Sequence, residues 1–176
     1  MKMLVKLLLP VMMLALCGCS LEVSPVSALA LDKTAGRYRL TAEIVRQDSL
    51  DEAASPAYLT VSGSDMPDLL QRLGNLLPGE LYLSHAQVLL LGENAAEESI
   101  LPLADYLCTD NDVRLSLRVA VVRGSTAADL LRNDDEVYAL SELLERAARA
   151  GTLPDMPLYR AAGVLHPPGT AILPAL

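Results

Sequence analysis

The short apolar run in residues 85–92, HAQVLLLG, constrains the fold of this 176-residue chain more than any other feature. The run is too short for most helices, and it fits a β-strand that is buried on both faces. A strand of that kind lies inside a sheet. The rest of the chain must therefore supply neighbouring strands and the elements that cover them.

Four other segments carry strand patterns. Residues 26–46 predict a hairpin, because apolar and polar side chains alternate on both sides of the turn sequence DKTAG. Gly36 in that turn can take a positive φ angle. Further strands are predicted at residues 58–63, 80–83 and 114–124.

Between these strands lie segments with the apolar periodicity of helices, at residues 64–79, 93–108, 126–132 and 137–150. Ser64 or Asp65 can cap the first helix, and Ser125 can cap the third. Gly151 suits the position that follows the last helix. Because helices and strands interleave throughout residues 26–150, the sequence predicts a mixed α/β (α+β) domain with one central β-sheet and helices packed on it.

The core of this domain has to be aliphatic, since 52% of the residues are apolar and the chain contains neither Phe nor Trp. Two of the helices show which side chains should face it. The stripe of the first helix consists of Leu69, Leu70, Leu73, Leu76 and Leu77, and that of the last of Val137, Leu140, Leu143, Leu144, Ala147 and Ala148.

The N-terminus has the layout of a secretory signal. Lys2 and Lys6 form a positive region before the apolar segment at residues 7–16, and small residues follow. This segment is too short to span a bilayer comfortably, since a spanning helix needs about 20 apolar residues. The next residues, LCGC at 16–19, resemble the processing site of bacterial lipoproteins, in which the chain is cut before a cysteine whose thiol is acylated.

We therefore predict a lipoprotein signal peptide over residues 1–18, lipidation of Cys19 and a short tether over residues 19–25. Cys17 is a poorer acceptor, because the bulky Leu16 precedes it where a small residue is wanted. A plain signal peptide or an N-terminal anchor helix is the alternative interpretation.

The charge pattern excludes some partners. The formal net charge is −8 and no basic patch is present, which argues against binding to nucleic acid. The acidic clusters at residues 109–112 and 133–136 lack the spaced acids and the distal Glu of a calcium loop, so we interpret them as turns and caps. Cys108 lies in a helical apolar pattern and is expected to be a small buried side chain.

His85, one of two histidines, is the remaining candidate for chemistry. The sequence contains no HExxH or CxxC pattern that would supply further metal ligands. Ser84 cannot form a dyad with it, since neighbours on a strand point to opposite faces. We predict a structural histidine at the start of a strand, with a hydrogen bond to a backbone group or an acidic neighbour. No catalytic residue, metal site or cofactor is predicted.

Five segments in this order resemble the N-terminal domain of the Ger(x)C family, the lipoprotein C subunit of spore germinant receptors in endospore-forming Firmicutes. They are residues 16–19, 29–45, 80–93, 100–131 and 155–160. The chain departs from the family pattern after Cys19, where SLEVSPV replaces a stretch rich in Trp, Asp and Arg. Family chains are also considerably longer.

The resemblance implies a non-enzymatic receptor subunit that is required for spore germination. Its lipid on Cys19 would hold it at the outer face of the spore inner membrane, and its partners would be two integral-membrane receptor subunits. Residues 26–152 would form the N-terminal domain. The proline-rich residues 153–176 would be a linker and the start of a further domain, apparently truncated. A generic surface or solute-binding lipoprotein is the alternative, and a secreted hydrolase is a third, less favoured class.

Overall fold

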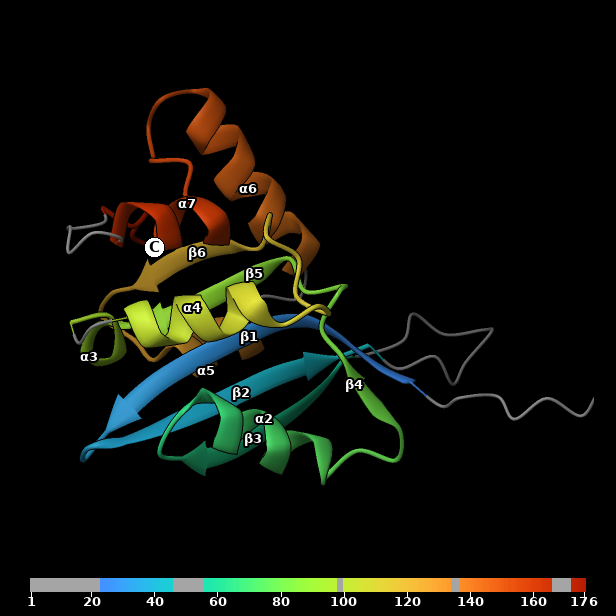
Figure 1. The fold of residues 1–176 in the computed structure, drawn as a ribbon. Helices are drawn as coiled ribbons and strands as arrows, with labels where there is room; N and C mark the ends of the chain where they lie inside the picture. The colour runs from blue at the N-terminus through green and yellow to red at the C-terminus, as the bar shows by residue number, and fades with distance from the viewer. Residues whose placement is uncertain (1–22, 46–55, 98–99, 134–136, 166–171) are drawn as a thin grey trace, which may run out of the picture.

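The computed structural model describes residues 23–45, 56–97, 100–133, 137–165 and 172–176 (Figure 1). Its strands are β1 (Val23–Thr34), β2 (Arg37–Ile44), β3 (Ala57–Gly63), β4 (Glu80–Tyr82), β5 (Val88–Gly92) and β6 (Arg118–Val122). Its helices are α2 (Met66–Gly74), α3 (Glu93–Ala96), α4 (Leu101–Thr109), α5 (Ala127–Asn133), α6 (Val137–Arg149) and α7 (Leu158–Leu165). In the described residues, one mixed sheet with helices packed around it makes an α+β fold, which confirms the predicted class.

Strand β1 is the centre of the sheet, whose order is β3-β2-β1-β5-β6. It pairs antiparallel with β2 through a tight turn, in which Ala35 and Gly36 take φ angles of 50° and 77°. Two positive φ angles in succession match the twist of a two-residue hairpin, so the predicted hairpin is confirmed. On its other edge, β1 runs parallel first to β4 and then to β5, and β5 runs parallel to β6.

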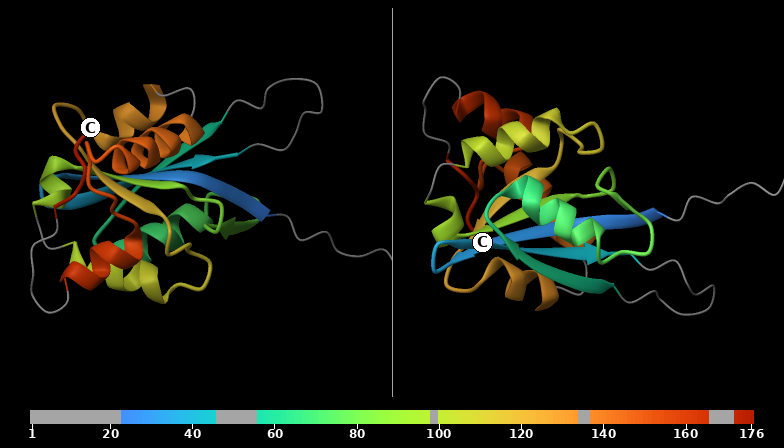
Figure 2. Two further views of the ribbon diagram at one scale, coloured as in Figure 1. Left: turned by 90° about the horizontal axis from the view of Figure 1, so that it is seen from above. Right: turned by 60° about the horizontal axis from the view of Figure 1, so that its bottom comes forward.

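Helices cover both faces of this sheet (Figure 2). Leu89 and Leu91 of β5 point into the larger core cluster, which also contains residues of α2, α4 and α7. Val88 and Leu90 point into the second cluster, under α5 and α6. All of β5 is buried, as predicted for a strand covered on both faces.

The helix starts agree only in part with the predicted caps. The backbone N–H of Asp68 donates to the Asp65 carboxylate at 2.9 Å, so Asp65 caps α2. At α5 the acceptor is the Thr126 hydroxyl, 3.0 Å from the backbone nitrogen of Asp129, and the predicted cap Ser125 was wrong by one residue.

The apolar stripes predicted for α2 and α6 include leucines that the structure leaves exposed. Helix α2 ends at Gly74, so Leu76 lies beyond it and is 58% exposed. Leu143 on α6 is 48% exposed, because Leu140 and Leu144 already fill the surface between that helix and the sheet. Gly151 ends α6 as predicted, with a φ of 73°.

Both ends of the described chain differ from the expected boundaries. Residues 23–25, expected in the tether, belong to β1 and pair with β4. Residues 153–176 were expected to be a linker and the start of a further domain. Within them, Leu158 and Ala161 of α7 are buried in the larger core cluster. Pro174 and Leu176 hydrogen-bond to the backbone of Val121 in β6, so these parts pack onto the same sheet. Pro154 and Pro157 precede α7, so neither interrupts it.

The expected signal peptide and Cys19 lie outside the described residues. Within the described ranges, no helix combines the length and the apolar character needed to cross a membrane.

Candidate functional site

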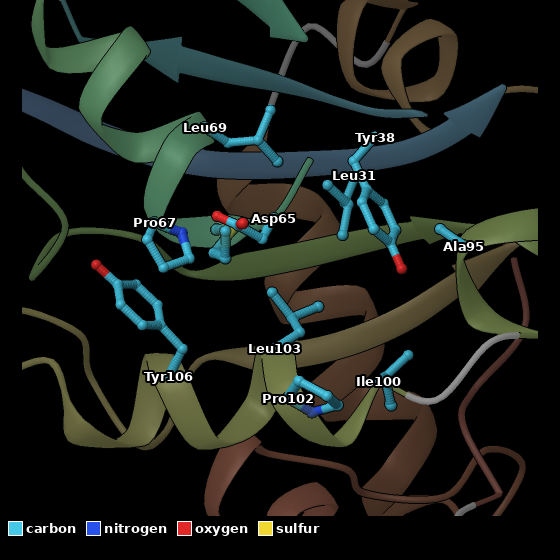
Figure 3. A pocket seen from close by; sticks show the side chains of 11 residues that line it. Leu31, Tyr38, Asp65, Pro67, Leu69, Ala95, Ile100, Pro102, Leu103 and Tyr106 are labelled. Atoms are coloured by element: carbon cyan, nitrogen blue, oxygen red, sulfur yellow. The ribbon is translucent and has the colours of Figure 1, made fainter. Parts of the chain in front are cut away.

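A pocket of about 320 Å³ opens between α2 and α4 on the face of the larger core cluster (Figure 3). Its lining comes from Leu31, Tyr38, Asp65, Met66, Pro67, Leu69, Ala95, Ile100, Pro102, Leu103 and Tyr106. The volume is at the lower end of the range of small-molecule sites, about 300–1,000 Å³.

The pocket exists because two short helices approach the sheet without closing against each other. Leu31 of β1 and Tyr38 of β2 form its floor. Pro67 lies in the first turn of α2 and Pro102 in the first turn of α4, where proline is tolerated because the first N–H groups have no partner within the helix. The two proline rings and Leu103 make the walls apolar (Figure 3).

The polar groups at this pocket come from Tyr38, Tyr106 and Asp65. Asp65 is already engaged, since one carboxylate oxygen accepts from the backbone of Asp68 and the other accepts from the Ser64 hydroxyl at 3.0 Å. Tyr106 can offer its hydroxyl group to a bound molecule. The arrangement therefore suits the binding of an apolar group with a polar end.

An ion pair stabilises the start of α2 beside this pocket. Arg72 donates from Nε to the Asp68 carboxylate at 2.6 Å, and the backbone of Ser64 donates to the other oxygen at 3.1 Å. The hydrogen bond from Arg72, followed by that from Ser64, holds the pKa of Asp68 below its usual value. The pair is exposed, so its contribution is limited by solvent screening.

His85 lies outside this pocket, in an exposed turn before β5. Its ring contacts the Tyr82 ring with centroids 5.5 Å apart, and its backbone oxygen accepts from the Gln87 amide at 3.2 Å. The expected buried hydrogen bond of the imidazole is not among the contacts of the described residues. The strand pattern misled the prediction because β5 begins only at Val88.

The other predicted features of the sequence also have structural explanations. In the first acidic cluster, the backbone of Asp112 donates to the Asp110 carboxylate at 2.9 Å, which makes a turn as expected. The second cluster lies mostly outside the described residues. Cys108 is half-buried, and burial raises the pKa of its thiol, with a smaller contribution from the charge of Asp105. Among the described residues, no group of three or more His, Cys, Asp or Glu side chains could hold a metal ion.

One important carboxylate was missed by the sequence analysis. Asp32 lies two residues before the end of β1 and is 7% exposed. Its two oxygens accept from the backbone of Ala127 at 2.8 Å and Ala128 at 3.0 Å. Gly92 of β5 lies against it, and a Cβ at that glycine would be 2.4 Å from the carboxylate. Asp32 therefore fixes the start of α5 to the end of β1. Partners separated by about ninety-five positions leave no local sequence signal.

These observations define the class as an α+β domain with helices on both faces of a mixed sheet and an apolar pocket between two of them. In a comparison with known protein families, the chain matches the spore germination protein N-terminal domain over residues 22–176. It belongs to this family, and it is a germination-related protein of the C-subunit type, as the resemblance indicated. No curated protein and no solved structure matches the chain significantly.

Proposed function

We propose that this protein is a lipid-anchored, non-enzymatic subunit of a spore nutrient germinant receptor. The observation that carries the proposal is the family match over residues 22–176, which includes every described strand and helix. The proposal that the subunit is not an enzyme is supported by the structural roles of the buried Asp32 carboxylate and the capping Asp65 carboxylate. Asp32 and Asp65 are both occupied by hydrogen bonds that fix helix starts.

The anchor in this proposal is the acylated Cys19. It stands three residues before the family match, directly after the signal-like segment. A single acyl chain gives only marginal membrane binding, whereas two acyl chains retain a protein stably. The lipid would hold the domain at the outer face of the spore inner membrane. There it would assemble with two integral-membrane subunits of the receptor.

The experiment replaces the proposed acceptor. Spores and sporulating cells that carry Cys19→Ala should lose the palmitate label, lose the protein from the membrane fraction and germinate slowly with nutrients. Cys108→Ser is the matched control, because it removes a half-buried thiol and leaves the acceptor intact. Unchanged membrane retention and an unchanged palmitate label in the Cys19→Ala protein would refute the anchor.

A solute-binding lipoprotein is the second candidate, and the pocket between α2 and α4 is the observation that favours it. Neighbouring genes separate the two candidates. A receptor subunit should be encoded beside two multi-span membrane proteins, whereas a solute-binding lipoprotein should lie beside a transporter.

A further inference from the structure

We propose that the end of the sheet where β1 begins is a membrane-contacting surface, formed by Val23 and the α2–β4 connection at residues 75–79. This inference rests on the lipid anchor of the proposed function. It adds the orientation of the domain on the bilayer and the residues that touch the lipid surface.

The first argument is the length of chain between the anchor and the fold. Because β1 begins at Val23, only residues 20–22 separate the acylated cysteine from the sheet. Four residue steps of at most about 3.6 Å give a reach of about 14 Å. The headgroup region of a bilayer is itself about 5–7 Å thick on each side. The start of β1 is therefore held at the membrane surface.

The second argument is the direction of the strands. The first pair between β1 and β4 joins Val23 to Glu80, so the connection that leads into β4 lies at the same end of the sheet. Figure 1 shows this end opposite the β1–β2 turn. The eleven residue steps from Val23 to Thr34 correspond to about 36 Å along a strand. One end of the domain is thus close to the bilayer, and the hairpin turn is far from it.

The third argument is the chemistry of the two ends. Val23 is 39% exposed and Leu76 is 58% exposed, although both are apolar, and Pro78 beside them is also exposed. Residues 73–79, LGNLLPG, carry no charged side chain, and Glu80 follows them. A small apolar, uncharged protrusion of this kind suits the boundary between headgroups and acyl chains.

The opposite end of the sheet has the reverse character. The exposed side chains of Arg37, Glu93, Arg123 and Asp129 lie at or next to the far ends of the strands, with Arg123 and Glu93 3.8 Å apart as an ion pair. Transferring these charges toward lipid would cost far more than leaving them in water. These charges oppose contact between the hairpin end of the sheet and lipid. Exposed charged residues also lie near the other end, at Glu80 and Arg114, so the surface that contacts lipid is limited to Val23 and residues 75–79.

The test measures how deeply a single fluorophore, attached to the lipidated full chain, lies in a lipid bilayer. In a Cys108→Ser background, Leu76→Cys, Thr34→Cys and Leu143→Cys are labelled with an environment-sensitive dye. The proteins are reconstituted into vesicles of phosphatidylcholine and phosphatidylglycerol that contain a doxyl-labelled phosphatidylcholine as quencher. Leu143 is the matched control, since it is an exposed leucine on α6, away from the proposed surface.

We expect the label at residue 76 to lose most of its emission to the quencher, and the labels at residues 34 and 143 to keep theirs. Equal melting temperatures of the three labelled proteins would show that each is folded. Suppose that palmitate is found on Cys19 and that the protein floats with the vesicles. Quenching of the label at residue 143 in place of residue 76, or of none of the three labels, would then overturn the proposed orientation. Protein without palmitate that does not float would instead refute the proposed anchor, and this inference with it.

Discussion

Replacing Asp32 tests whether the buried carboxylate holds α5 on the sheet. Asp32→Ala removes the acceptors of two backbone N–H groups, those of Ala127 and Ala128, and leaves them buried at the start of the helix. Hydrogen bonds to a charged group contribute about 1.5–3 kcal/mol each, and the two share one carboxylate, so we expect a loss of about 2–4 kcal/mol. That is a large part of the total stability of a domain, about 5–15 kcal/mol.

The assay is urea unfolding of residues 19–176 carrying Cys19→Ala, followed by circular dichroism. With a slope of about 1–3 kcal/mol per molar urea, the midpoint should fall by about 1–2 M. Asp32→Asn should be intermediate, because its amide has one acceptor oxygen for two donors. Asp129→Ala is the control, an exposed acid in the first turn of the same helix that contributes only about 0.3–1 kcal/mol through the helix dipole. If Asp32→Ala costs no more than this control, the reasoning is refuted.

Three further predictions concern the core, the turn and the pH dependence. Leu90→Asp places an unpaired charge at a fully buried position, on the face of β5 that packs against α5 and α6, so the variant should fail to fold. A cooperative melt like that of wild type would contradict this assignment. His85→Asn should change the melting temperature little and leave spore germination intact, because the side chain is exposed; a folded variant that abolishes germination would place His85 in a functional site. Because the folded pKa of Asp68 is lowered, the stabilisation from Arg72 is present above the unfolded pKa of about 4 and is lost as pH falls through the folded value. The stability difference between wild type and Arg72→Ala should therefore shrink in acid, and a difference that stays constant down to full protonation would argue against the ion pair.

Sequence reasoning predicted the parts of the fold that depend on residues close together in the chain. The alternation on each side of Gly36 specified a hairpin, and the run at 88–91 specified a strand covered on both faces, because burial imposes its pattern on consecutive residues. The helix boundaries were less accurate. Leu76 continues the helical apolar pattern of α2, yet the helix has already ended at Gly74.

The parts that were missed depend on tertiary contacts. The pocket arises from the gap between α2 and α4, and no periodicity within either helix reports the distance between them. The bond from Asp32 to α5 joins two segments that are far apart in the chain. Helix α7 was overlooked because the prolines around it suggested a linker, although Leu158 and Ala161 are spaced for one buried face.

The position of β1 at the centre of the sheet determines the order in which the domain can fold. Its pairing with β2 closes a two-residue turn, but its pairing with β5 joins Leu29 to Leu89, across sixty residues. Closing a long segment costs chain entropy before any contact compensates for it, so folding is slow in folds dominated by such pairings. The β1–β2–β3 meander can form as soon as its residues have been synthesised, whereas the parallel half of the sheet must wait until β5 and β6 have followed. During that interval one edge of β1 has no partner strand, and a chaperone that binds extended segments would find its target there.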